Sequence, residues 1–131
     1  MNKIFGFFIL SCISAHAQLA VTVMSPKIVA HKAAVEIVMT NGFSVKVESA
    51  RAVCFLLDDQ GQMVGQSTKW VIGQNKTSLA AGATNTFNFV ITSPQSFTTT
   101  NLTAKISFSR VVLDGGNLAD PKTDVQIGNS K

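Results

Sequence analysis

The chain has 131 residues, of which 46% are hydrophobic and 14% are charged, and its formal net charge is +4 at pH 7. This length fits one domain with a single hydrophobic core and excludes two domains of ordinary size. The lysines and arginines are spread singly along the chain, which argues against the continuous basic track of a nucleic-acid-binding protein.

The first residues have the three parts of a secretory signal peptide. Lys3 supplies the positive charge, an apolar run follows it, and Ala15 and Ala17 form a small-residue cleavage pattern. The apolar run is about half as long as the roughly 20 residues that a membrane-spanning helix needs. We therefore expect residues 1–17 to be a signal peptide and residues 18–131 to form a periplasmic or secreted domain without a membrane span.

Two alternatives for this segment stay open. Cleavage after Ala15 instead of Ala17 would make His16 the N-terminal residue, where an amine and an imidazole can chelate copper. The residues that end at Cys12 also loosely resemble a lipoprotein processing site, at which Cys12 would be acylated.

Signal cleavage would also change the charge and the cysteine count. The net charge would fall to +3, because Lys3 is the only charged residue in the segment, and Cys54 would be the single cysteine left. A disulfide within the mature chain is then impossible, so the fold must depend on its hydrophobic core. Cys54 lies in the apolar run AVCFLL, which predicts a buried rather than a reactive thiol.

After Gln18 the apolar residues recur with a period of two, which is typical of an antiparallel all-β domain. Pro26 lacks an amide for the hydrogen-bond ladder, so the first strand is predicted at a sheet edge. The parity of the alternation changes at Arg110, as a β-bulge would require. The predicted strands lie, in chain order, around residues 19–23, 35–39, 52–57, 64–72, 86–91, 104–113 and 125–127.

The strand around residues 52–57 is predicted to be central in its sheet, because both of its faces are apolar. We expect Phe55 and Leu57 to point into the core. Strands at spacings of roughly ten residues predict an all-β, immunoglobulin-like antiparallel two-sheet sandwich of about seven strands, preceded by the signal peptide.

Two acidic stretches could in principle bind a metal. Asp58 and Asp59 are followed by Gly61 but by no further carboxylate, so they predict a tight turn rather than a calcium loop. The stretch at residues 114–120 partly matches the glycine and aspartate repeats of calcium-binding β-helices, but it occurs once, so it also predicts a turn.

The sequence predicts neither an enzyme nor a cofactor. His31 is the only histidine beyond residues 1–17, and no G-x-S-x-G nucleophile motif is present. The alternative function is a periplasmic copper-binding carrier with an N-terminal histidine, in which Met24, Met39 and Met63 could supply soft ligands. The small exported carriers that suggest it need a further histidine near the C-terminal strands, and none follows His31.

One stretch resembles the FxLYD domain family, which has an F-x-L strand, a turn with aspartate and glycine, and a later "pG…F" segment. Asp58 stands at the family's tyrosine, and Ala81 stands where proline often precedes the glycine. The resemblance covers about half of the mature chain and implies an exported bacterial immunoglobulin-like domain without catalytic residues. The matching residues are Asn41, Phe55, Leu57, Asp59, Gly61, Gly82 and Phe87.

These features together predict a non-catalytic interaction or accessory module of the cell envelope. We expect a monomer that binds an envelope or secreted protein, with no nucleic acid and no cofactor. The long polar segments 73–85 and 93–102 are the expected contact loops, and Trp70 is a further candidate contact residue.

Overall fold

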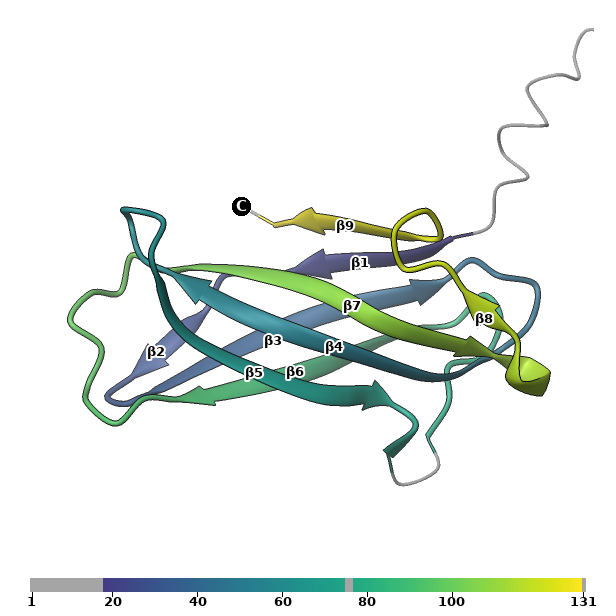
Figure 1. The fold of residues 1–131 in the computed structure, drawn as a ribbon, viewed down its shortest axis with the longest axis horizontal. Coiled ribbons are helices and arrows are strands. Elements are labelled where there is room, and N and C mark those ends of the chain that lie inside the picture. Colours follow the sequence, from purple (N-terminus) through teal and green to yellow (C-terminus); the bar gives the residue numbers. More distant parts are fainter. Residues whose placement is uncertain (1–17, 75–76, 131) are drawn as a thin grey trace, which may run out of the picture.

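The computed structural model describes residues 18–74 and 77–130, which form two β-sheets packed face to face, with the long strands along the long axis (Figure 1). The five-stranded sheet contains β1 (Leu19–Val23), β2 (Lys27–Val29), β3 (Lys32–Asn41), β6 (Thr84–Thr92) and β9 (Val125–Asn129). The four-stranded sheet contains β5 (Met63–Ile72), β4 (Val47–Leu57), β7 (Thr103–Leu113) and β8 (Leu118–Ala119).

The predicted immunoglobulin-like two-sheet sandwich is therefore confirmed, although the described residues form nine strands in place of about seven. The two strands that the sequence pattern missed are β2 and β8. They span three and two residues, too few for an alternation to be recognised. The predicted signal peptide, with Cys12 and His16, lies outside the described residues. In the described part of the chain, no helix has the length and apolar character needed to cross a membrane.

The core lies between the two sheets and follows the period-two pattern. In β3 the side chains of Val35, Ile37 and Met39 are fully buried, whereas Glu36 between them is exposed. Burying one such aliphatic side chain contributes about 1.5–3 kcal/mol. The inward residues of the other long strands and β1 include Leu19, Val21, Val23, Ala52, Cys54, Leu56, Phe89, Ile91, Ala104, Ile106 and Phe108.

The prediction that β1 is an edge strand is wrong. β1 pairs antiparallel with β3 on one side and parallel with β9 on the other. Pro26 interrupts the chain only after β1 has ended at Val23, so it removes no ladder hydrogen bond from β1. The C-terminal strand β9 takes the edge position, and its pairing with β1 is the one parallel pair among the described strands.

The prediction that Phe55 and Leu57 point into the core is also wrong. β4 is central in its sheet as expected, between β5 and β7, but it turns Ala52, Cys54 and Leu56 inward at 0% exposure. Phe55 and Leu57 lie on the opposite, outer face and are half-buried. Both faces of this strand are apolar, so the alternation alone could not show which face is turned inward.

The predicted β-bulge in β7 is confirmed. Arg51 of β4 pairs with Arg110, whereas the next residue, Ala52, pairs with Phe108. Ser109 is therefore the extra residue on β7. Ser109 and Arg110 are both exposed opposite Arg51, after which the inward alternation resumes.

Each open side of the sandwich is joined by one side chain that reaches from one sheet to the other. On one side the Lys69 Nζ of β5 donates to the Asn88 carbonyl oxygen of β6 at 2.7 Å and lies 5.7 Å from the centre of the Phe89 ring. On the other side the Asn129 Nδ2 of β9 donates to the Ala104 carbonyl oxygen of β7 at 3.1 Å. Both bonds use edge-strand carbonyl groups that could otherwise pair with another chain.

The opposite orientations of Leu56 and Leu57 give a direct test of the β4 assignment. We expect Leu56→Ala to lower the free energy of unfolding by about 3 kcal/mol, because it leaves a cavity in the core. Leu57→Ala removes a half-buried side chain on the outer face and should cost only about 1 kcal/mol. Urea unfolding of the two variants measures the difference, and a larger loss for Leu57→Ala would show that β4 is turned the other way.

Candidate functional site

The outer face of the four-stranded sheet carries aromatic, apolar and cationic side chains together. We call it the basic face. Its residues alternate with the inward residues of the same strands, so they point away from the core. The basic face consists of Arg51, Val53, Phe55 and Leu57 of β4, Gln66, Thr68 and Trp70 of β5, and Thr103, Lys105, Ser107 and Arg110 of β7.

An apolar stripe runs along β4 in the middle of the basic face. Val53, Phe55 and Leu57 of β4 are half-buried, whereas the polar residues on both neighbouring strands are exposed. Phe55, for example, lies between Gln66 of β5 and Lys105 of β7. The stripe is thus flanked mainly by polar and cationic side chains, with Met63 of β5 opposite Leu57, and an apolar centre with a polar rim is the arrangement of a protein interface.

Two arginines lie directly opposite each other at one end of this stripe. The register pairs Arg51 of β4 with Arg110 of β7, and both side chains are exposed. Arg51 Nη1 donates weakly to Ser109 Oγ at 3.4 Å, and Ser109 Oγ donates to the Arg51 carbonyl oxygen at 3.3 Å. Like charges directly opposite each other on adjacent strands are destabilising, so this pair favours the approach of an anion.

The cross-strand rows of Arg51, Arg110 and Lys105 carry charge of one sign. The four strands of this sheet are described in full, and their only carboxylate is that of Glu48. Its Oε2 accepts a hydrogen bond from the Gly115 amide at 3.2 Å, in the short turn that follows β7. No carboxylate of these strands therefore lies in the cross-strand rows of Arg51, Arg110 and Lys105.

Trp70 extends the arginine row onto β5. It is the cross-strand partner of Arg51 and is half-buried. Beside it lies a hollow of about 270 Å³ that Ser49, Gly73 and Gln74 also line. The sequence predicts Trp70 as a possible contact residue, and the structure places it on a partly exposed sheet face, opposite Arg51 and in one cross-strand row with Arg110.

Arg51, Lys105 and Arg110 are site residues that the sequence pattern did not predict. They are far apart along the chain and meet only through the β4–β7 register. The predicted bulge is a signal for Arg110 alone, because a parity change next to it determines which face its side chain joins.

The acidic stretch after β4 is a turn. One oxygen of Asp58, Oδ1, accepts hydrogen bonds from the amides of Gln60 and Gln62, both at 2.9 Å. Gly61 has a φ of 79°, which its lack of a Cβ allows. The second acidic stretch likewise turns the chain, through Gly115 and Gly116 with φ of 80° and 85°.

The Asp58 turn faces one of the predicted contact loops across a cleft of about 350 Å³ at one end of the sandwich. The cleft brings Asp58 and Asp59 together with residues 93–102. Phe97 of this loop is half-buried against the core, and its amide donates to the Ala30 carbonyl oxygen at 3.1 Å. The loop is therefore attached to the turn between β2 and β3 as well as to its own strands.

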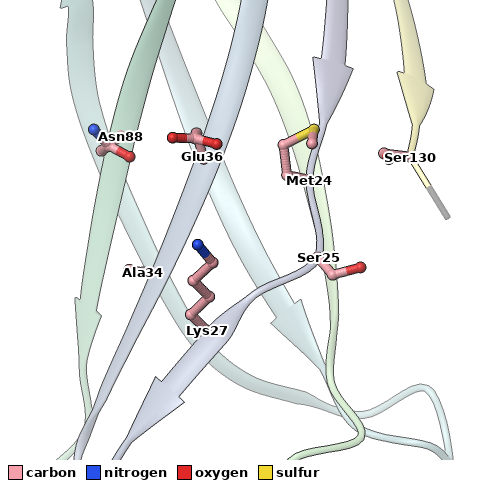
Figure 2. Close-up of a pocket in the computed structure, with 7 residues that line it drawn as sticks. All are labelled: Met24, Ser25, Lys27, Ala34, Glu36, Asn88 and Ser130. Carbon is pink, nitrogen blue, oxygen red and sulfur yellow. The ribbon is translucent and has the colours of Figure 1, made fainter.

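A groove of about 440 Å³ lies on the outer side of the five-stranded sheet (Figure 2). Figure 2 shows the Lys27 side chain extending toward Glu36, so the groove carries one charge of each sign. The groove is lined by Met24, Ser25, Lys27, Ala34, Glu36, Asn88 and Ser130.

The upstream asparagine and the later glycine of the family-like motif meet in the structure. Asn41 is fully buried, and its Nδ2 donates to the carbonyl oxygens of Val45 and Leu79 at 3.0 and 2.9 Å. The Gly82 amide donates to the Asn41 carbonyl oxygen at 2.8 Å. Phe87 is half-buried against the core, at a different position from both.

The candidate metal ligands do not come together in the described residues. His31 is exposed after β2, Met39 is buried in the core, and Met63 is 56% exposed at the start of β5. Among residues 18–74 and 77–130, no group of three or more histidine, cysteine, aspartate or glutamate side chains could hold a metal ion.

No protein-family model matches the chain, and no curated protein matches it. Its fold is similar to the crystal structure of a Bordetella pertussis protein described as ApaA, with a TM-score of 0.55 and 16% identity over 79% of this chain and 85% of that chain. A second solved structure, a structural genomics target, has a TM-score of 0.46 and 8% identity over 79% of this chain and 76% of that one. The first similarity supports the sandwich fold alone.

The buried thiol of Cys54 gives a chemical test of the structure. Burial raises the pKa of Cys54 from its ordinary value of 9.0 to about 12, so the thiolate that reacts with alkylating reagents is suppressed in the folded chain. We expect iodoacetamide at pH 8 to modify Cys54 only in urea, as measured by peptide mass spectrometry.

The same pKa shift predicts a pH dependence of stability. The unfolded chain loses the thiol proton near pH 9, whereas the folded chain keeps it to about pH 12. The stability that this group contributes is complete below pH 9 and decreases as the pH rises toward 12. Cys54→Ala should not show this part of the decrease in stability when urea unfolding is measured between pH 8 and 12.

Rapid alkylation of Cys54 in the folded protein would contradict its burial.

Proposed function

We propose that the chain is a small exported bacterial immunoglobulin-like domain, periplasmic or secreted, that acts by binding. In this proposal it is a non-catalytic interaction or accessory module of the cell envelope, as the resemblance to the FxLYD family implies. The partner is an envelope or secreted protein.

The observation that carries the proposal is the composition of the basic face. Its centre is the half-buried stripe of Val53, Phe55 and Leu57, and its rim is mainly polar and cationic. Tryptophan and arginine are the residue types that most often dominate interface energetics, and Trp70, Arg51 and Arg110 form one cross-strand row here.

The groove on the five-stranded sheet and the cleft at the end of the sandwich support binding less directly. The groove of Figure 2 is lined by Lys27 and Glu36, one charge of each sign, so its side chains present no net charge to a partner. In the end cleft, the Asp58 carboxylate already holds two amides of its own turn. The basic face combines an unopposed charge with apolar surface, which supports its assignment as the main contact surface.

A pull-down from envelope extract of the source bacterium tests the proposal. The double substitution Val53→Thr and Phe55→Thr removes apolar contacts while keeping residues that favour β-strands. We expect it to weaken the binding free energy by about 2 kcal/mol, and so to lower the amount of partner that is recovered. Quantitative mass spectrometry of the recovered proteins measures the effect.

Two control variants make the result specific. Val90→Thr changes an apolar side chain that is 55% exposed on the outer face of the other sheet, and it should leave recovery unchanged. Thr98→Ala changes the end cleft. If the Thr98 variant loses the partner and the face variant keeps it, the contact surface is the predicted loop and not the basic face.

A further inference from the structure

The chemistry of the basic face identifies a class of partner, and this step rests on the proposed function. Arg51 and Arg110 are opposed across two strands, Lys105 lies farther along the same face, and their rows contain no carboxylate. We propose that the basic face binds an acidic protein segment whose carboxylates pair with Arg51 and Arg110 and whose apolar side chains pack on the stripe of Val53, Phe55 and Leu57.

The cross-strand register holds the guanidinium groups of Arg51 and Arg110 on adjacent strands. Two guanidinium groups held on adjacent strands repel each other, and a carboxylate between them would exchange this repulsion for charge-assisted hydrogen bonds. Guanidinium binds carboxylate through two parallel N–H donors. An anionic partner therefore gains attraction from the same pair that is unfavourable in the free domain.

The composition of the stripe favours a protein segment over other anions. Val53, Phe55 and Leu57 are half-buried between exposed polar side chains of both neighbouring strands, so a matching partner presents apolar side chains beside its anionic groups. A sugar polymer could satisfy the cations but would leave the apolar side chains unmatched. A polypeptide can present carboxylates and projecting apolar side chains in alternation.

The spacing of the face fits an extended segment. Arg51 and Phe55 are four residues apart on β4, which is about 13 Å along a strand, and Lys105 lies opposite Phe55. A segment that runs along β4 would therefore meet cations at both ends of this interval and apolar residues between and beyond them. Acidic residues four positions apart with an apolar residue between them match this order.

A second copy of the chain is a poor occupant when the two faces meet. A symmetric contact would place the same three cations of each copy on one interface, and Glu48, the only carboxylate of these strands, lies outside the cross-strand rows of those cations. The like charges would then repel across the contact. Face-to-face pairing of two copies is therefore unfavourable.

Trp70 makes the proposal directly measurable, because it is the only tryptophan of the chain and lies on the basic face. The probe is a synthetic peptide in which glutamate and leucine alternate, each separated by serine. The control peptide has glutamine at every glutamate position. Titration of the purified full chain, followed by Trp70 emission and by anisotropy of the labelled peptide, gives the dissociation constants.

The decisive variant is Arg51→Glu with Arg110→Glu. We expect it to weaken binding of the acidic peptide about tenfold or more. The matched control, Lys32→Glu with Lys122→Glu, makes the same change of charge at exposed residues outside the basic face and should bind as the unmodified chain does. Arg51→Lys with Arg110→Lys keeps the charge but loses the bidentate geometry, so it should lose an intermediate amount of affinity for the acidic peptide. This variant replaces the reversed pair in the test if the reversed pair fails to fold.

Several outcomes would overturn the proposal. The arginine pair is not the site that binds the acidic segment if the glutamine peptide binds as tightly as the glutamate peptide. The same conclusion follows if the lysine control loses as much affinity as the reversed arginine pair. Tighter binding of heparin or of phosphatidylglycerol vesicles than of the acidic peptide would identify a different class of ligand. If the Val53 and Phe55 variant loses the envelope partner while the reversed arginine pair keeps it, the domain still acts by binding but the acidic partner is wrong.

Discussion

The inward packing of Ala52, Cys54 and Leu56 is the constraint on which the rest of the four-stranded sheet depends. Side chains in a strand alternate between faces, so this choice places Arg51 and Phe55 outside. The register then transfers the orientation to β5 and β7 on either side. The apolar stripe and the cationic row are consequences of how one central strand is turned.

The alternation in the sequence predicts a strand well when one of its faces is polar. Val35, Ile37 and Met39 are buried as expected because Glu36 and its neighbours mark the outer face of β3. β4 has no polar face, so the period of two predicts that the strand exists but not which of its faces is turned inward. The prediction for Phe55 and Leu57 is wrong for this reason.

The prediction that β1 is an edge strand is wrong for a different reason. Its second neighbour, β9, comes from the other end of the chain, and no local pattern carries that information.

In the candidate site, too, the sequence predicts local features but not the pairing of residues that lie far apart along the chain. Trp70 could be noticed because a single tryptophan in a strand is a local feature. Arg51 and Arg110 could not be joined from the sequence, since their contact depends on the β4–β7 register and on the extra residue Ser109. Scattered charges along a β-chain therefore do not imply scattered charges on its surface, because antiparallel pairing brings distant residues into one row.

The sandwich itself does not need the arginine pair. Its two open sides are joined by Lys69 and Asn129, each of which donates to a carbonyl group of the opposite sheet, and its core is closed without a residue of the basic face. Opposed like charges cost a fold up to about 1 kcal/mol, and this cost falls on the free domain alone. A surface that is slightly unfavourable in isolation and favourable against carboxylates is typical of a binding site, where stability is reduced in exchange for function.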